Sequence, residues 1–215
     1  MKKYNEIEGD LIELAKQGNF DVIAHGCNCF CNMGAGIAPL MAEAFGCDKF
    51  TLELIELTEY SDDGLDYKIS TNNRGNINKL GQIDYEKIGI NTKTGKCLIG
   101  YSLPKANSII EVNVVNAYIQ YSYGKNHVDG VSVPLDYEAL TLCLRKINHE
   151  FKGKHIGLPL IGCGLAGGIW DINLLTEDEL KDITFDLNSY KDVKTIIQEE
   201  LKDCNVTIVF YNKNK

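Results

Sequence analysis

The chain has 215 residues, of which 44% are hydrophobic and 24% charged, a composition typical of an ordinary globular protein. Its formal net charge is -8 and no basic stripe appears, so general binding to nucleic acid is not expected. The beginning MKKYNEIEGD does not match a signal peptide, and no apolar run approaches the roughly 20 residues that span a bilayer. We therefore expect a cytoplasmic, monomeric protein without a membrane partner, whose eight cysteines are mostly reduced.

The first quarter of the chain alternates between strand and helix patterns. We expect an edge strand over 2–10, a short helix closed by Gly18, an apolar strand over 21–26, a loop over 27–34, a helix from Ala35 to a stop at Gly46, and a second helix over 49–60. The helix from Ala35 is predicted because apolar residues recur at helical spacing. Glycine after the last apolar residue is a common helix end.

The segment 61–108 has a different texture, polar and rich in turn residues, with a hairpin predicted to turn at Thr92–Gly95. We interpret it as an insertion along one edge of a single domain 1–215, and 171–190 as a second insertion. The rest of the chain predicts a central strand over 108–120, a helix over 135–151, a strand over 155–162, a helix over 192–204 and a final strand over 205–212. This order predicts the α/β class, a three-layer α/β/α sandwich with a mixed central sheet.

Two glycine-rich loops follow predicted buried strands, at 25–38 and 160–170. Ligands of such sheets bind beyond the carboxyl ends of the strands. Glycine lets backbone N–H groups approach an anion closely, and Gly34 and Gly36 precede a helix whose first N–H groups lack partners. The loops could clamp a diphosphate from both sides, or they could be tight strand–helix connections without a ligand.

Four stretches together resemble a macrodomain: EGD at 8–10, HGCN…MGAGIA at 25–38, VVNAYIQYSYG at 114–124 and LPLIGCGLAGGIW at 158–170. The resemblance covers most of the chain apart from 61–108 and 171–190. Macrodomains bind ADP-ribose, and some hydrolyse ADP-ribosyl bonds or ADP-ribose 1''-phosphate. The first loop resembles the branch of ADP-ribose-1''-phosphate phosphatases and terminal ADP-ribose–protein glycohydrolases.

The resemblance implies a role for each matched residue. The implied contacts are to adenine from Asp10 and Leu11, to the distal phosphate and ribose from Gly34, Ala35, Gly36 and Ile37, to the diphosphate from Gly162, Cys163, Gly164, Leu165 and Ala166, and to the distal ribose from Asn28. Tyr121 and Tyr123 could place a ring over the distal ribose or could simply cover the end of the sheet. Trp170 would pack at the base of the second loop, and His25 would lie close behind Asn28.

The chain departs from the glutamyl-ADP-ribose hydrolases, which use a lysine after the central strand and an aspartate in the phosphate loop. Tyr121 and Ala166 stand in those places, and Ile169 replaces the aspartate that other relatives carry before the tryptophan. Our first choice is therefore removal of phosphate from ADP-ribose 1''-phosphate. The alternatives are a glycohydrolase acting on modified protein or nucleic acid, and a non-catalytic module for ADP-ribose or cyclic ADP-ribose.

Phosphate removal needs a base or a nucleophile, and His25, Asp171 and His127 are the candidates, with Asn28 beside them. His25 could instead be a buried structural histidine, Asn28 a turn-stabilising residue and Asp10 a helix N-cap. His25 with the alternating Cys27, Cys29 and Cys31 could suggest zinc, but the spacing does not match paired zinc ligands. We expect no metal and no cofactor.

Overall fold

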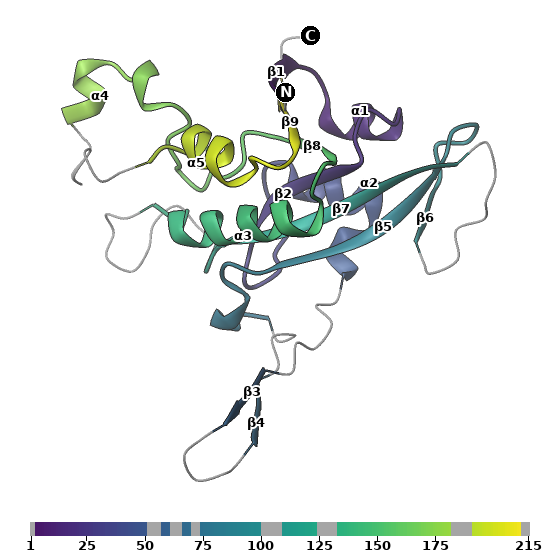
Figure 1. Ribbon diagram of the computed structural model, residues 1–215, viewed down its shortest axis with the longest axis horizontal. Coiled ribbons are helices and arrows are strands. Elements are labelled where there is room, and N and C mark those ends of the chain that lie inside the picture. The colour runs from purple at the N-terminus through teal and green to yellow at the C-terminus, as the bar shows by residue number, and fades with distance from the viewer. Residues whose placement is uncertain are drawn as a thin grey trace.

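The computed structural model describes residues 3–50, 57–60, 66–69, 74–99, 109–123, 133–181 and 191–211 (Figure 1). Its centre is a seven-stranded sheet in the order β1-β9-β8-β2-β7-β5-β6. The strands are β1 (Tyr4–Glu8), β2 (Val22–Asn28), β5 (Ile83–Asn91), β6 (Cys97–Ile99), β7 (Ile109–Gln120), β8 (His155–Leu158) and β9 (Asn205–Phe210). The five strands from β1 to β7 pair in parallel, whereas β5 and β6 add antiparallel pairs, so the expected mixed sheet is confirmed.

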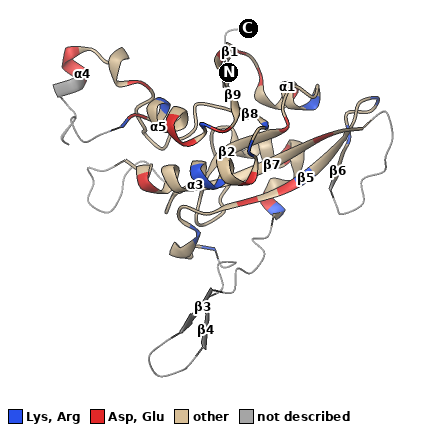
Figure 2. Cartoon of the chain, in the orientation of Figure 1, with Lys and Arg blue, Asp and Glu red and all other residues tan. Residues whose placement is uncertain are grey.

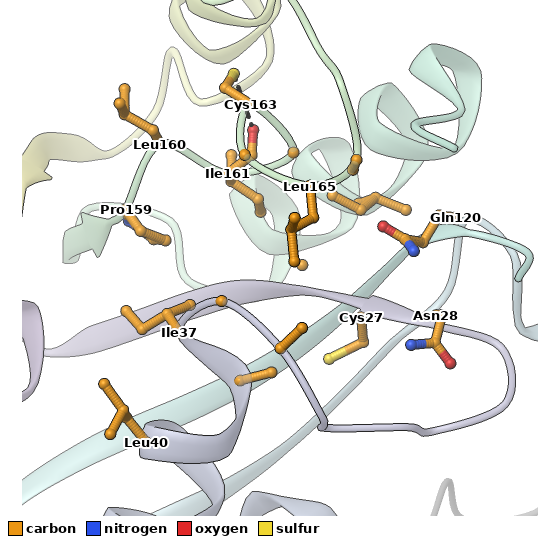
Figure 3. A pocket seen from close by; sticks show the side chains of 18 of the residues that line it. Cys27, Asn28, Ile37, Leu40, Gln120, Pro159, Leu160, Ile161, Cys163 and Leu165 are labelled. Carbon is orange, nitrogen blue, oxygen red and sulfur yellow. Dashed lines mark hydrogen bonds between the residues drawn. The ribbon is translucent and has the colours of Figure 1, made fainter. Parts of the chain in front are cut away.

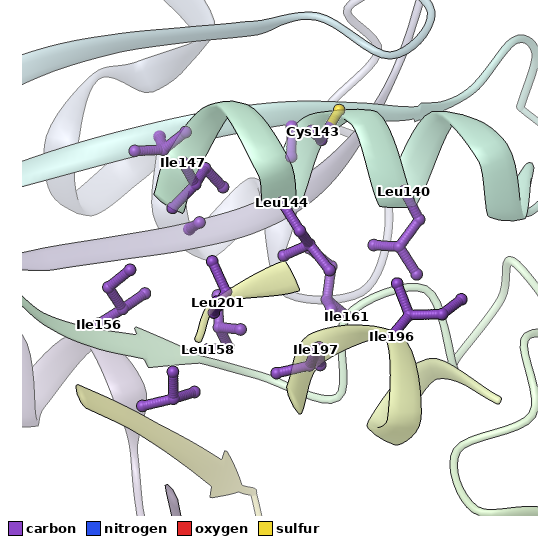
Figure 4. Close-up of a cluster of buried hydrophobic side chains, with 14 of the residues drawn as sticks. Leu140, Cys143, Leu144, Ile147, Ile156, Leu158, Ile161, Ile196, Ile197 and Leu201 are labelled. Carbon is purple, nitrogen blue, oxygen red and sulfur yellow. The ribbon is translucent and has the colours of Figure 1, made fainter. Parts of the chain in front are cut away.

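Helices cover both faces of the sheet, which confirms the three-layer sandwich. The longer helices are α1 (Leu11–Lys16), α2 (Ala38–Phe45), α3 (Tyr137–Glu150) and α5 (Val193–Glu200), and the short ones are α4 (Glu177–Lys181) and the 3-10 turns η1 (Cys47–Lys49), η2 (Ile77–Lys79) and η3 (Ile172–Leu174). One core packs α1 and α2 against the sheet, and the other packs α3 and α5 (Figure 4). Because successive strand residues point to opposite faces, Val22 and Ala24 lie in the second core and Ile23 in the first.

The predicted helix ends are largely confirmed. Gly46 terminates α2 in the left-handed conformation at φ 69°, and Gly18 follows α1 at φ 81°. The helix predicted from Ala35 begins later, because Ala35 to Ile37 form a bend and turn and α2 starts at Ala38. Similarly, β2 continues to Asn28, two residues beyond the predicted strand.

The second helix predicted over 49–60 is wrong at its end. Leu57–Tyr60 forms strand β3, which pairs antiparallel with β4 (Asp66–Ile69) in a separate two-stranded sheet. Thr58 and Tyr60 are of residue types that favour strands, and cross-strand pairing overrides the helical spacing read from the sequence. Residues 51–56 lie outside the described ranges.

The hairpin predicted at Thr92–Gly95 is confirmed, since β5 and β6 pair around that turn with Gly95 at φ 67°. β5 also pairs with β7, so this part of 61–108 extends the central sheet at its edge. Whether 61–108 and 171–190 are insertions stays a prediction.

The described Lys and Arg residues are distributed over several elements among Asp and Glu residues (Figure 2). Within the described ranges, no helix combines the length and the apolar character needed to cross a bilayer.

Candidate functional site

A cleft of about 860 Å³ lies at the edge of the sheet where the parallel strands end. Its walls are the first glycine loop (28–37) after β2 and the second glycine loop (159–168) after β8 (Figure 3). Twelve of the residues expected to bind or act on the ligand line it: Asp10, Leu11, Asn28, Gly34, Ala35, Gly36, Ile37, Gly162, Cys163, Gly164, Leu165 and Ala166. Because the strands are parallel, their carboxyl ends bring these segments together.

The second glycine loop is held by its own backbone. The N–H of Gly168 donates to the carbonyl of Gly162 at 2.9 Å, and the N–H of Gly167 donates to the carbonyl of Gly164 at 3.0 Å. The N–H groups of Ile161 and Cys163 also donate to carbonyls within the loop, whereas no described residue accepts a hydrogen bond from the N–H groups of Gly162, Gly164, Leu165 and Ala166. Unpaired N–H groups beside a cleft are a site for an anion.

The first glycine loop is held at its base by a side chain. The side-chain amide of Asn28 donates to the carbonyl of Asn32 at 2.9 Å and accepts from its N–H at 3.1 Å. Asn28 therefore stabilises the turn, which is one of the two roles expected for it. In the part of the chain that the structure describes, no acceptor pairs with the N–H groups that follow, those of Gly34, Ala35, Gly36 and Ile37. No side chain caps the start of α2, so this wall also offers free donors to an anion.

Asp10 lies at one end of the cleft and caps α1. Its Oδ1 accepts from the N–H groups of Ile12 at 2.8 Å and Glu13 at 3.1 Å. Its Oδ2 makes no hydrogen bond with a described residue, so one carboxylate oxygen remains for a ligand. Tyr211, which is 66% exposed, also lines the cleft and was missed from the sequence. The signal for it is an aromatic residue directly after the last strand.

The opposite end of the cleft is formed by residues at and just after the end of β7. Gln120 and Tyr123 line it, and Figure 3 shows Gln120 across from Asn28. Gln120 was not expected to contact a ligand, whereas Tyr121 and Tyr123 were both candidates for a ring over the distal ribose. Of these two tyrosines, Tyr123 lines the cleft, and the hydroxyl of Tyr121 instead donates to the carbonyl of Gly75 at 3.1 Å.

The side chain of His25 is fully buried and does not line the cleft, which matches one of the alternatives that the sequence left open. Its Nε2 lies 2.8 Å from Oδ1 of Asn116 and 3.5 Å from Sγ of Cys47. Burial lowers the pKa of His25 to about 4, although the bond to Asn116 opposes this shift. A buried, hydrogen-bonded imidazole has a structural role here, and a role of His25 as a base for a ligand stays a prediction.

A second buried polar group lies beneath the first glycine loop. The hydroxyl of Tyr118 donates to Oδ2 of Asp84 at 2.7 Å, and Sγ of Cys31 lies 3.7 Å from that hydroxyl. Oδ1 of Asp84 is buried without a hydrogen-bond partner among the described residues. Burial raises the pKa of Asp84 to about 6, more than the bond from Tyr118 lowers it.

Two further candidates lie away from the cleft. Asp171 accepts from Nζ of Lys194 at 3.1 Å, and this pair lowers the pKa of Asp171. Because its carboxylate is tied to Lys194, the structure does not place Asp171 as an acid or base for a ligand. Trp170 does not line the cleft either, and packs edge-on against Phe210 with ring centroids 6.1 Å apart. His127 lies outside the described residues.

Two cysteines line the cleft, Cys27 and Cys163. Burial raises the pKa of the Cys27 thiol well above its ordinary value and that of Cys163 to about 12. Both are therefore neutral thiols near pH 7, and neither is an activated nucleophile. Within the described ranges, His, Cys, Asp and Glu side chains form no group of three that could hold a metal ion.

Comparisons with known proteins agree with the fold. No protein-family model matches the chain. An uncharacterized 17.5 kDa protein from the tk-vs intergenic region of Enterobacteria phage T4 is 31% identical over 172 residues, which cover 77% of this chain and 82% of the phage protein.

Two solved structures extend the comparison. The structure of Thermosipho africanus DarTG in complex with ADP-ribose matches all of this chain and 43% of DarTG, with 14% identity and a TM-score of 0.51. The macrodomain of Thermus aquaticus DarG matches 97% of each chain, with 16% identity and a TM-score of 0.45. The chain therefore shares its fold with the matching part of DarTG and belongs to the same family as the phage T4 protein.

Proposed function

We propose that the cleft binds ADP-ribose. The observation that carries the proposal is the two sets of unpaired backbone N–H groups on facing glycine loops, because they suit a diphosphate in the middle of the cleft. The DarTG structure that shares this fold contains ADP-ribose, which supports the same ligand here.

The ends of the cleft fit the rest of such a ligand. Oδ2 of Asp10 can accept a hydrogen bond from the amino group of adenine, and the exposed ring of Tyr211 offers a surface for stacking. The distal ribose would lie at the other end, beside Asn28 and Gln120. A pocket with apolar walls and a few placed polar groups is typical of small-molecule sites.

Recognition is favoured over hydrolysis by the ionisable groups of the cleft. Among the described lining residues these are Asp10, the thiols of Cys27 and Cys163, and the phenols of Tyr123 and Tyr211. Asp10 stands at the adenine end, and neither thiol ionises near neutral pH. Removal of phosphate from ADP-ribose 1''-phosphate stays a prediction that would require His127, and cleavage of ADP-ribose from protein or nucleic acid stays its alternative.

The test is calorimetric titration of the protein with ADP-ribose and then with ADP-ribose 1''-phosphate, with detection of released phosphate. Gly164→Asp adds a carboxylate where a Cβ atom meets no neighbour within 4 Å, so the fold should tolerate it. Its charge should weaken ADP-ribose binding by about tenfold or more through repulsion of the diphosphate.

The matched control is Leu174→Asp, which adds the same charge at a side chain that is 73% exposed and does not line the cleft. It should bind ADP-ribose as the wild type does. Absence of binding by the wild-type protein would contradict the proposal. Phosphate release would add the phosphatase activity to the binding function.

A further inference from the structure

Three aromatic side chains form a cluster at the distal end of the cleft. The ring of Phe30 packs edge-on against Tyr121, with centroids 5.5 Å apart, and against Tyr123, with centroids 5.7 Å apart. Tyr123 is the member that lines the cleft, and its side chain is 58% exposed. An aromatic face held beside a cleft is a surface for stacking a planar group.

The cluster has a fixed base. The N–H of Gly75 donates to the carbonyl of Cys29 at 2.8 Å, and the hydroxyl of Tyr121 donates to the carbonyl of Gly75 at 3.1 Å. A Cβ atom on Gly75 would lie 2.8 Å from the ring of Phe30, so glycine lets that ring pack closely. These contacts fix Phe30 and Tyr121, and Tyr123 is placed against them.

Side-chain amides accompany the exposed ring. Nε2 of Gln120 donates to the carbonyl of Ser122 at 2.8 Å, which leaves its Oε1 without a partner among the described residues. The side-chain amide of Asn32 lines the same cleft and likewise pairs with none of them. Together they present hydrogen-bond donors and an acceptor that match a carboxamide group.

We propose that this end of the cleft binds a heterocyclic base that carries a carboxamide, so that the protein binds a nicotinamide dinucleotide. The proposal rests on the proposed function, because the ADP-ribose part would occupy the cleft as described above. The pyridine ring would stack on Tyr123, and its carboxamide would pair with Oε1 of Gln120 and the amide of Asn32. A positively charged pyridinium gains further attraction from an aromatic face.

The test compares the affinities of NAD+ and ADP-ribose by calorimetry in the wild type, Tyr123→Leu and Tyr211→Leu. We expect the wild type to bind NAD+ at least as tightly as ADP-ribose. Tyr123→Leu should lower the ratio of NAD+ to ADP-ribose affinity by about tenfold, the scale of one stacked base. Tyr211→Leu is the matched control, because a tyrosine at the adenine end should affect both ligands by the same factor.

Weaker binding of NAD+ than of ADP-ribose by the wild type, or an unchanged ratio in Tyr123→Leu, would overturn the inference while leaving ADP-ribose recognition intact. Binding of NAD+ without binding of ADP-ribose would instead overturn the proposed function. Failure of both ligands to bind would overturn both. A thermal melt of each variant checks folding, and both tyrosines are more than half exposed.

Discussion

The two glycine loops that form the walls of the cleft are held in different ways. The second loop is fixed by its own backbone bonds and by close packing, since a Cβ atom on Gly168 would lie 2.4 Å from Leu135. The first loop is tied by the side chain of Asn28, its Cys31 lies 3.7 Å from the Tyr118 hydroxyl that donates to the buried Asp84, and buried His25 belongs to β2, the strand that leads into the loop. The conformation of the second loop therefore depends on glycines that leave room for close packing. The conformation of the first loop depends on polar side chains.

This difference separates two uses of glycine that look alike in the sequence. In the second loop, Gly168 is required by packing, whereas at Gly164 a Cβ atom would meet nothing within 4 Å. In the first loop, Gly36 has φ 64° and open space around it, so conformation is what glycine provides there. We therefore expect the stability conferred by the first wall to depend on pH, and the stability conferred by the second wall to depend on added side-chain volume.

The largest expected effect concerns the buried groups His25 and Asp84. His25 has a folded pKa of about 4, below its ordinary 6.5, so the unfolded chain takes up a proton first and stability is lost as pH falls from 6.5 to 4. Asp84 has a folded pKa of about 6, above its ordinary 3.8, so stability is lost as pH rises from about 4 to 6. The two contributions oppose each other over the same range of pH.

Substitutions should separate these contributions. The free energy of unfolding of Asp84→Asn minus that of the wild type should rise by about 3 kcal/mol between pH 4 and 6, because two pKa units correspond to that energy. For His25→Gln, the same difference should fall by about 3 kcal/mol between pH 4 and 6.5. Urea unfolding at a series of pH values measures both, and parallel curves for the variants and the wild type would contradict the assignment.

The second effect concerns volume in the second loop. Gly168→Ala should lower the free energy of unfolding by about 2 kcal/mol, because its Cβ atom would also lie 2.8 Å from the backbone oxygen of Gly162, which cannot move freely. Gly164→Ala should change it by less than about 0.5 kcal/mol. Urea unfolding of the two variants provides the comparison, and equal losses would show that the loop is not held by packing.

The sequence located the backbone of this site better than its side chains. Glycine positions are visible in a sequence because their conformational freedom has no substitute, and ten of the residues placed on the two loops line the cleft. Burial of His25 was one of the alternatives that the sequence left open, and strand parity does not decide between them, because both faces of β2 are covered by a core and Cys27, which has the same parity as His25, lines the cleft.

Other features depended on contacts that no local pattern reports. Tyr123 and Tyr211 are far apart in the sequence and come to opposite ends of the cleft only through the sheet order. The pairing of β3 with β4 likewise overrode a helical spacing. Fold class was predictable because it depends on the alternation of whole elements, which single misplaced residues do not disturb.

The smallest expected effect concerns the tie at the base of the first loop. Asn28→Ala removes two hydrogen bonds to the backbone of Asn32 and should cost about 1 kcal/mol of unfolding free energy. Asn32→Ala is the matched control, because the tie uses only the backbone of Asn32 and should survive that change. ADP-ribose binding should weaken about fivefold in Asn28→Ala, since the loop must then be ordered by the ligand. Equal unfolding energies for the two variants would show that Asn28 does not hold this wall, and its place on the cleft would then be explained by ligand contact alone.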